Sequence, residues 1–134
     1  MIETVTKIRV LYAHTDKMGV VNNSRYLEYF EAGRNELLRE IGCPYTIFES
    51  NNVLLPVTEV YCKYIAGVRY DDVLEVRAML KEVPGARIKI FYEVTTGGKI
   101  AATGYTVHSF VDSVKFKARR PPEDFVELIK SKLK

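Results

Sequence analysis

The stretch HTDKMGVVNNSRYLEYFEAGR, residues 14–34, decides the fold, because a short polar segment in it runs directly into the longest helical pattern of the chain. Apolar and small residues recur there at the spacing of one helix face: Tyr26, Phe30, Gly33, Leu37 and Ile41. Further apolar residues widen that face, which is typical of a buried helix: Leu27, Tyr29 and Leu38. We predict a helix from Asn23 to Ile41 that ends at Gly42, with Pro44 preventing its continuation.

Asp16 lies ahead of this helix and is not placed as its cap. An aspartate near a helix start usually caps it, but Asn22, Asn23 and Ser24 stand closer to the predicted first turn. The segment 18–21, MGVV, is too apolar for a solvated loop, and Gly19 lets the backbone turn tightly. We expect a folded segment that leaves the Asp16 carboxylate available for another role.

Length and composition indicate one soluble globular domain, residues 1–134. Hydrophobic residues make up 47% and charged residues 28%, which excludes a disordered chain. No apolar run has the length of a membrane span, and the first ten residues, MIETVTKIRV, lack a signal-peptide pattern. We therefore expect a cytoplasmic protein with no membrane partner.

The net charge and the two cysteines are also those expected of a cytoplasmic protein. The net charge is +3, with basic residues gathered late in the chain: Lys115, Lys117, Arg119, Arg120, Lys130, Lys132 and Lys134. Such a segment can attract nucleic acid, but we interpret it as solvated surface and expect no nucleic-acid partner. Cys43 and Cys62 form no CxxC motif and no disulfide framework, so we expect reduced, small apolar residues.

The rest of the chain predicts an α+β domain. We expect strands over the extended runs 4–12, 53–64, 74–81, 87–94 and 100–111, with Pro56 marking an edge or a bulge. Pro84-Gly85 and Gly97-Gly98 supply hairpin turns, a short helical turn falls within residues 44–50, and a last helix follows Pro121-Pro122. An antiparallel sheet buries the long helix only by curling around it. The strand 100–111 is apolar on both faces, which predicts a partner subunit.

Common catalytic and metal motifs are absent from the sequence. It contains no GxGxxG, GxxxxGKS/T, HExxH or GxSxG pattern. His14 and His108 have no companion ligand at metal-binding spacing, so we expect no metal and no cofactor, and we interpret His108 as a hydrogen-bonded structural residue.

The helix start offers a different chemistry. Unpaired N–H groups near Asn22 to Ser24 lie at the positive end of the helix dipole and can polarise a carbonyl oxygen. A carboxylate beside that carbonyl can attack it or activate a water molecule. Asp16 and these N–H groups therefore predict a metal-free hydrolytic site.

These residues carry a family resemblance. The pattern Y-x-x-T-D-x-M-G-V-V-N-N-x-x-Y-x-x-Y-F-E-x-G-R, residues 12–34, resembles the signature of the 4-hydroxybenzoyl-CoA thioesterase-like acyl-CoA thioesterases, which have the hotdog fold. RYDD at 69–72 and HSFVD at 108–112 are also similar to that family. The resemblance implies a curled antiparallel sheet around one long central helix, a short C-terminal helix, dimers and often tetramers, and hydrolysis of acyl-CoA. It also implies catalytic roles for the Asp16 carboxylate and the Asn23 backbone N–H.

Further residues are expected at the substrate. With the resemblance, we expect Gly19, Val20, Val21, Asn22 and Tyr26 at the substrate. Several family members carry an aromatic residue or histidine where this chain has Asn22 and Asn23, so acyl preference does not transfer. Lys63 and Arg69 are candidates for the CoA phosphates, although Arg69 can instead pair with Asp71 or Asp72. Glu31 and Arg34 are interpreted as a helix ion pair.

Other functions remain open from the sequence. The first is a non-catalytic acyl-CoA or acyl-carrier-protein binding module, in which Asp16 only holds its loop. The second is an enoyl-thioester hydratase, which would be expected to pair an aspartate with a histidine in one short motif, and none follows Asp16. Whether Asp16 attacks directly or through water is also open.

Overall fold

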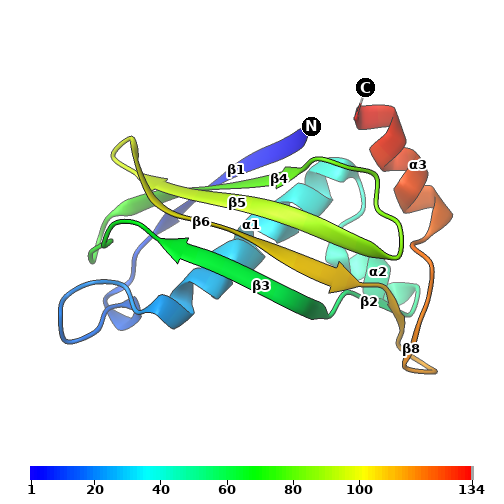
Figure 1. Cartoon of the computed structure of the whole chain (residues 1–134), viewed down its shortest axis with the longest axis horizontal. Coiled ribbons are helices and arrows are strands. Elements are labelled where there is room, and N and C mark those ends of the chain that lie inside the picture. The colour runs from blue at the N-terminus through cyan, green and yellow to red at the C-terminus, as the bar shows by residue number, and fades with distance from the viewer. Residues whose placement is uncertain (134) are drawn as a thin grey trace.

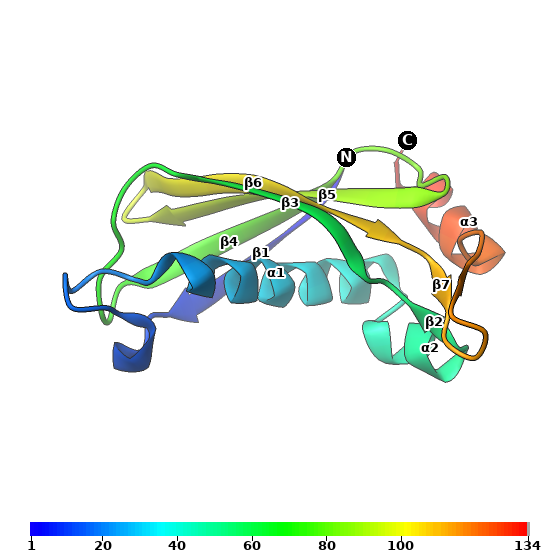
Figure 2. The ribbon, with the colours of Figure 1, turned by 60° about the horizontal axis from the view of Figure 1, so that its bottom comes forward.

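The computed structural model describes residues 1–133 and shows a curled sheet laid over one long helix (Figures 1 and 2). Its elements follow in chain order: β1 (Ile2–Arg9), α1 (Tyr26–Ile41), α2 (Tyr45–Ser50), β2 (Val53–Leu54), β3 (Val57–Tyr64), β4 (Val73–Leu80), β5 (Arg87–Thr96), β6 (Lys99–Ser109), β7 (Val111–Asp112), β8 (Lys117–Ala118) and α3 (Glu123–Lys132). Two short 3₁₀ helices, η1 (Tyr12–His14) and η2 (Asn23–Arg25), precede α1.

The main sheet has the strand order β1-β4-β5-β6-β3, and all its neighbours are antiparallel. Figure 2 shows α1 lying along the concave side of this sheet, with α2 near the C-terminal end of α1. A smaller sheet of β2, β7 and β8 extends beyond the main one. The predicted hotdog arrangement, a curled antiparallel sheet around a central helix with a short C-terminal helix, is confirmed.

Close packing of α1 against the sheet explains why Gly33 lies in the buried face of this helix. A Cβ built on Gly33 would lie 2.9 Å from Cγ1 of Val76 on β4, so the helix approaches the sheet there as only glycine permits. One turn earlier, the Phe30 ring stacks on Tyr92 with centroids 4.3 Å apart. These contacts fix the height and rotation of the helix whose first turn forms the candidate site.

Both ends of α1 are set by local sequence. Asn22 is the N-cap of η2, whose three residues tighten the first turn, so regular α-helix begins at Tyr26 rather than at the predicted Asn23. Gly42 ends the helix in the left-handed conformation with φ +99°, as predicted.

Three predicted strands differ from the observed ones. The run 100–111 divides into β6, which ends at Ser109, and β7, which begins at Val111 and belongs to the smaller sheet. β1 spans Ile2–Arg9 instead of residues 4–12, because its pairing with β4 ends at Arg9 opposite Val73 and the chain then turns into η1. The run 53–64 divides into β2 and β3 around Pro56, which has no N–H to donate to a ladder. β3 forms an edge of the main sheet, which confirms the edge interpretation.

The remaining predictions for this part of the chain hold. The short helix within 44–50, the hairpin turns at Pro84-Gly85 and Gly97-Gly98, and the last helix are all present. His108 is 1% exposed and both ring nitrogens are hydrogen-bonded, as expected for a structural histidine. Within residues 1–133, both cysteines are free thiols, and no helix is long and apolar enough to cross a membrane.

Candidate active site

The segment between η1 and η2 folds back on itself as a small hairpin. Thr15 and Val21 form an isolated antiparallel bridge, and the Asp16 N–H donates to the Val20 carbonyl at 2.9 Å. The Gly19 N–H closes the turn by donating to the Asp16 carbonyl at 3.0 Å, with Gly19 at φ +77°. This turn requires the left-handed conformation at residue 19, which explains the glycine there.

A second loop holds the hairpin against the sheet. The Val21 N–H donates to the Val68 carbonyl at 2.7 Å, and Val20 forms a bridge with Arg69. Val21 and Val68 are buried, whereas Val20 is half-buried. The apolar character of residues 18–21 is therefore used partly for packing against the 65–72 loop.

The Asp16 carboxylate is exposed at the tip of this hairpin. Its Oδ1 accepts the Met18 N–H at 2.9 Å, the geometry of an Asx turn. One carboxylate oxygen thus shapes the turn, and no hydrogen bond to Oδ2 is found within residues 1–133. Asp16 is partly committed to its own loop, as the binding-module alternative expects, rather than wholly available for another role.

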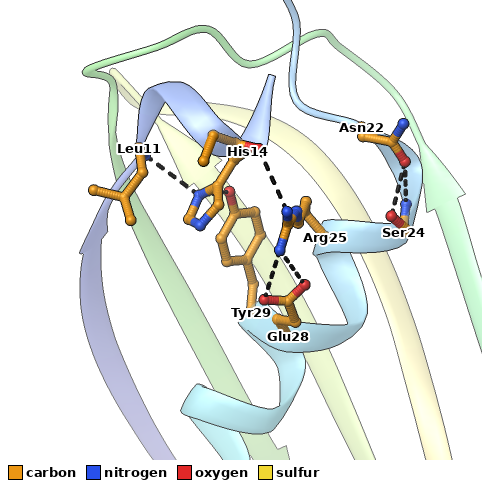
Figure 3. Close-up of polar contacts among 8 residues, drawn as sticks. Leu11, His14, Asn22, Ser24, Arg25, Glu28 and Tyr29 are labelled. Carbon is orange, nitrogen blue, oxygen red and sulfur yellow. Dashed lines mark hydrogen bonds and ion pairs between the residues drawn. The ribbon is translucent and has the colours of Figure 1, made fainter. Parts of the chain in front are cut away.

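The first turn of the helix is arranged around Asn22 (Figure 3). The Asn22 side-chain Oδ1 accepts the Ser24 backbone N–H at 3.0 Å and the Ser24 hydroxyl at 2.8 Å. The Asn22 backbone N–H donates to the His14 carbonyl at 2.8 Å. The N–H of Asn23 has no acceptor among the described residues. A backbone donor is therefore available at the positive end of the helix.

Aromatic side chains lie beneath this helix start. Tyr26, predicted at the substrate, is 3% exposed and packs edge-on against Tyr64 and Tyr29. The Tyr64 hydroxyl donates to the Asn23 carbonyl at 3.2 Å. The C-terminal residue of β3, 41 positions away in sequence, is thus bonded to this turn.

A contact between His14 and Tyr29 was not predicted from the sequence. The Tyr29 hydroxyl lies 2.9 Å from His14 Nδ1, and burial, helped by nearby Tyr26 and Glu28, raises the pKa of Tyr29 to about 12 (Figure 3). Tyr29 therefore stays protonated. The Leu11 N–H also donates to His14 Nδ1, at 3.3 Å, so that nitrogen is an acceptor and the Tyr29 hydroxyl donates to it. The residues are 15 positions apart, and no local pattern signals a contact that depends on how the hairpin folds back.

Arg25 adds a second connection between the segment and α1. Its guanidinium donates to the Ala13 carbonyl at 3.4 Å and pairs with the Glu28 carboxylate at 3.0 Å (Figure 3). The segment before the helix and the first turn of α1 are therefore held together by side-chain contacts as well as backbone ones.

The two basic residues predicted at the CoA phosphates lie on different elements. Arg69 stands beside the hairpin, since a Cβ built on Gly19 would be 3.7 Å from its Nη1. Asp72 accepts the Arg69 backbone N–H at 2.9 Å and Asp71 pairs with Arg9 at 3.2 Å, so neither carboxylate forms an ion pair with the Arg69 side chain. Lys63 is exposed on β3 opposite Thr103.

The arrangement supports carbonyl chemistry. A carbonyl oxygen placed at the Asn23 N–H would be polarised by that donor and by the helix dipole, and one such donor typically changes a rate by about 10²- to 10³-fold. Across residues 1–133, no group of three or more His, Cys, Asp or Glu side chains is arranged to hold a metal ion.

Comparison with known proteins places these features in one family. Residues 10–129 match the model of the thioesterase-like superfamily. A putative esterase of Aquifex aeolicus is 32% identical over 91% of this chain and 94% of its own, and a putative acyl-CoA thioesterase of Bacillus subtilis is 30% identical over 83% and 81%. The crystal structure of a DHNA-CoA thioesterase from Staphylococcus aureus is 28% identical, with a TM-score of 0.93 over 98% of this chain and 91% of that one.

Proposed function

We propose, since this chain belongs to the thioesterase-like superfamily, that it hydrolyses acyl-CoA thioesters to a free acid and CoA. The observation that carries the proposal is the Asn23 N–H, a backbone donor without an acceptor among residues 1–133 that follows the Asp16 hairpin at a helix start. The B. subtilis relative named an acyl-CoA thioesterase supports the substrate class.

In the proposed reaction the thioester oxygen accepts the Asn23 N–H, and two routes lead to hydrolysis. In one, an Asp16 oxygen adds to the carbonyl carbon, the C–S bond breaks with release of the CoA thiolate, and water hydrolyses the resulting anhydride. In the other, Asp16 takes a proton from water, hydroxide adds to the carbon, and the proton passes to the departing sulfur. Both routes use the same carboxylate and the same backbone donor.

Residues around the hairpin are assigned to the substrate in this proposal. Gly19, Val20, Val21 and Asn22 form the segment between the two reacting groups, and Tyr26 is the buried first residue of the helix that follows. Arg69, beside Gly19, and exposed Lys63 are proposed to hold the CoA phosphates.

A binding module is the second candidate, and one observation favours it. The Met18 N–H on Asp16 Oδ1 is the contact expected of an aspartate that braces its loop. Assaying a panel of acyl-CoA compounds for free thiol separates the two functions. Steady thiol release supports the hydrolase, whereas binding without release supports the module. A product hydrated across a double bond would instead identify a hydratase.

The proposal includes assembly into a homodimer or a dimer of dimers, that is a homotetramer, in the cytoplasm. β3 is an edge strand whose large apolar side chains are 44–50% exposed: Val57, Val60, Tyr61 and Tyr64. An exposed apolar edge is an aggregation risk unless a partner covers it. The free thiols of Cys43 and Cys62 agree with a reducing compartment.

A further inference from the structure

The hairpin that carries Asp16 is joined to the helix start at its base, where His14 lies. Inside the hairpin, the Asp16 and Gly19 N–H groups bond to carbonyls of the same hairpin, so these bonds set its shape and not its position. At the base, the His14 carbonyl accepts the Asn22 N–H at 2.8 Å. Asn22 directly precedes Asn23, whose N–H is the proposed carbonyl donor. His14 therefore stands two residues before the carboxylate and is bonded to the residue before the donor.

The His14 ring is held on α1 through its Nδ1 atom (Figure 3). Nδ1 accepts the Tyr29 hydroxyl at 2.9 Å and the Leu11 N–H at 3.3 Å. The His14 and Tyr29 rings also pack edge-on, with centroids 5.6 Å apart. Tyr29 is 2% exposed and packs edge-on against Tyr26, so it belongs to the buried face of α1. The base of the hairpin is thus fastened to a residue that the core of the domain holds in place.

Few other contacts can hold the hairpin in place on the helix. The backbone bond from the Val21 N–H ties the hairpin to the 65–72 loop instead. The Arg25 guanidinium reaches the segment at 3.4 Å, but this bond is longer and Arg25 itself precedes α1. Within residues 1–133, the bond from Tyr29 to His14 is the one side-chain hydrogen bond between the base of the hairpin and α1 itself. The position of the hairpin on the helix therefore depends on this bond.

We propose that His14 and Tyr29 are positioning residues for the hydrolysis: their bond fixes the hairpin on α1, and thereby the Asp16 carboxylate relative to the Asn23 N–H. This inference rests on the proposed function, in which both groups act on one thioester carbonyl. A misplacement of about 1 Å can lower a rate about 10²-fold, so a bond outside the reacting groups can control turnover. Nδ1 must carry no proton to accept both of its donors, so the His14 ring carries its proton on Nε2.

Tyr29→Phe keeps the buried ring and removes only the hydroxyl. The kcat for an acyl-CoA should fall by about tenfold while KM changes by less than about twofold, because the reacting groups are misplaced and the substrate contacts remain. His14→Leu removes the acceptor and should lose as much, and the double variant should be no worse, since both residues act through one bond. His14→Asn returns an acceptor oxygen near the Nδ1 position and should restore at least about a third of the wild-type kcat. Ser131→Ala is the control: it removes a hydroxyl that donates to the Leu128 carbonyl at 2.7 Å in α3, and it should leave kcat unchanged.

Backbone amide exchange gives a readout that needs no substrate. In Tyr29→Phe the Asp16 and Asn22 N–H groups should exchange faster by about tenfold, because the hairpin leaves α1 more often, and the Val76 N–H on central strand β4 should keep its rate. Unchanged exchange or unchanged kcat in Tyr29→Phe would overturn this inference alone. So would equal losses of kcat in His14→Asn and His14→Leu, or a higher KM at unchanged kcat. A wild-type protein that releases no thiol would instead overturn the proposed hydrolysis and, with it, this role.

Discussion

Asp16 accepts a backbone N–H and is also the proposed catalytic carboxylate, and one substitution distinguishes these roles. Asp16→Asn keeps the size and the acceptor oxygen but removes the charge and the basic oxygen, so turnover should fall by at least about 100-fold while the melting temperature changes little. Turnover and melting temperature are measured with the same acyl-CoA. A folded variant that keeps more than about a tenth of the turnover, a barrier change below roughly 1.4 kcal/mol, returns Asp16 to the loop-bracing role.

Asp112 is a matched control for that experiment. Its Oδ1 accepts the N–H groups of Val114 and Lys115 at 2.8 and 3.1 Å, which is the same kind of turn contact in a different hairpin. Because asparagine keeps the acceptor oxygen, Asp112→Asn should change the melting temperature little, as Asp16→Asn does, and should leave turnover intact. An equal loss of turnover in the two variants would show that a change in a turn contact, rather than loss of a catalytic group, explains both.

Arg69 and Lys63 are proposed to bind the phosphates at the nucleotide end of the substrate, and this role can be tested separately. Reversing both, as Arg69→Glu with Lys63→Glu, should raise the KM for an acyl-CoA and leave that for the matching acyl-pantetheine unchanged, because only the former carries the nucleotide phosphates. Lys99→Glu, at the exposed β5–β6 turn, is the control. A KM that rises equally for both substrates would remove the phosphate role.

His108 predicts a pH dependence of stability. Its pKa falls from an unfolded value near 6.5 to about 4, mainly through burial, while the Leu55 hydrogen bond opposes the shift and Arg34 adds to it. Between these values the unfolded chain binds a proton that the native protein does not, so stability is full above pH 6.5 and is lost as the pH falls. Urea unfolding should show a loss of about 2 kcal/mol between pH 7 and pH 5 from this group. His108→Gln should flatten that part of the profile, and an unchanged slope would contradict the assignment.

At the scale of elements, the contact between α1 and β4 depends on Gly33, which has no side chain to hold the two apart. Gly33→Leu places atoms where Val76 already lies, so the free energy of unfolding should fall by about 1–3 kcal/mol or more. Gly85→Leu, at a turn where an added Cβ meets nothing within 4 Å, is the matched control. Denaturant unfolding of both variants measures the difference, and equal stabilities would mean that the helix can move away from the sheet at little cost.

Elements set by neighbouring residues could be predicted from the sequence, and those set by distant partners could not. Gly42 and the Gly97-Gly98 turn act through their own backbone conformations, and the structure has them at positive φ. The end of β1 depends on where β4 ends, and the His14–Tyr29 contact depends on how the hairpin folds back. For the candidate site, the sequence predicted a cap among Asn22, Asn23 and Ser24, of which the structure uses Asn22, and a tight turn at Gly19. The bond from the Met18 N–H to Asp16 depends on side-chain geometry that the pattern does not determine.

At the scale of the whole molecule, the edge strand β3 predicts self-association. Light scattering of the purified protein at micromolar concentration should give the mass of a dimer or a tetramer, because burial of Val60 and its apolar neighbours outweighs the loss of translational freedom. Val60→Lys should shift the protein toward monomer. Val5→Lys, at an exposed position on the opposite edge, is the control and should not. A wild-type monomer would contradict the proposed assembly.

The opposite edge has a different character. β1 alternates charged residues with its inward side chains: Glu3, Lys7 and Arg9 are exposed, Glu3 pairs with Arg77, and Arg9 pairs with Asp71. Charges along an edge oppose the addition of another strand. A subunit with an apolar edge at β3 and a charged edge at β1 can pair with one neighbour through β3. The combined sheet then has β1 at both of its outer edges. Growth into an open-ended fibre is blocked by the same fold that favours the pair.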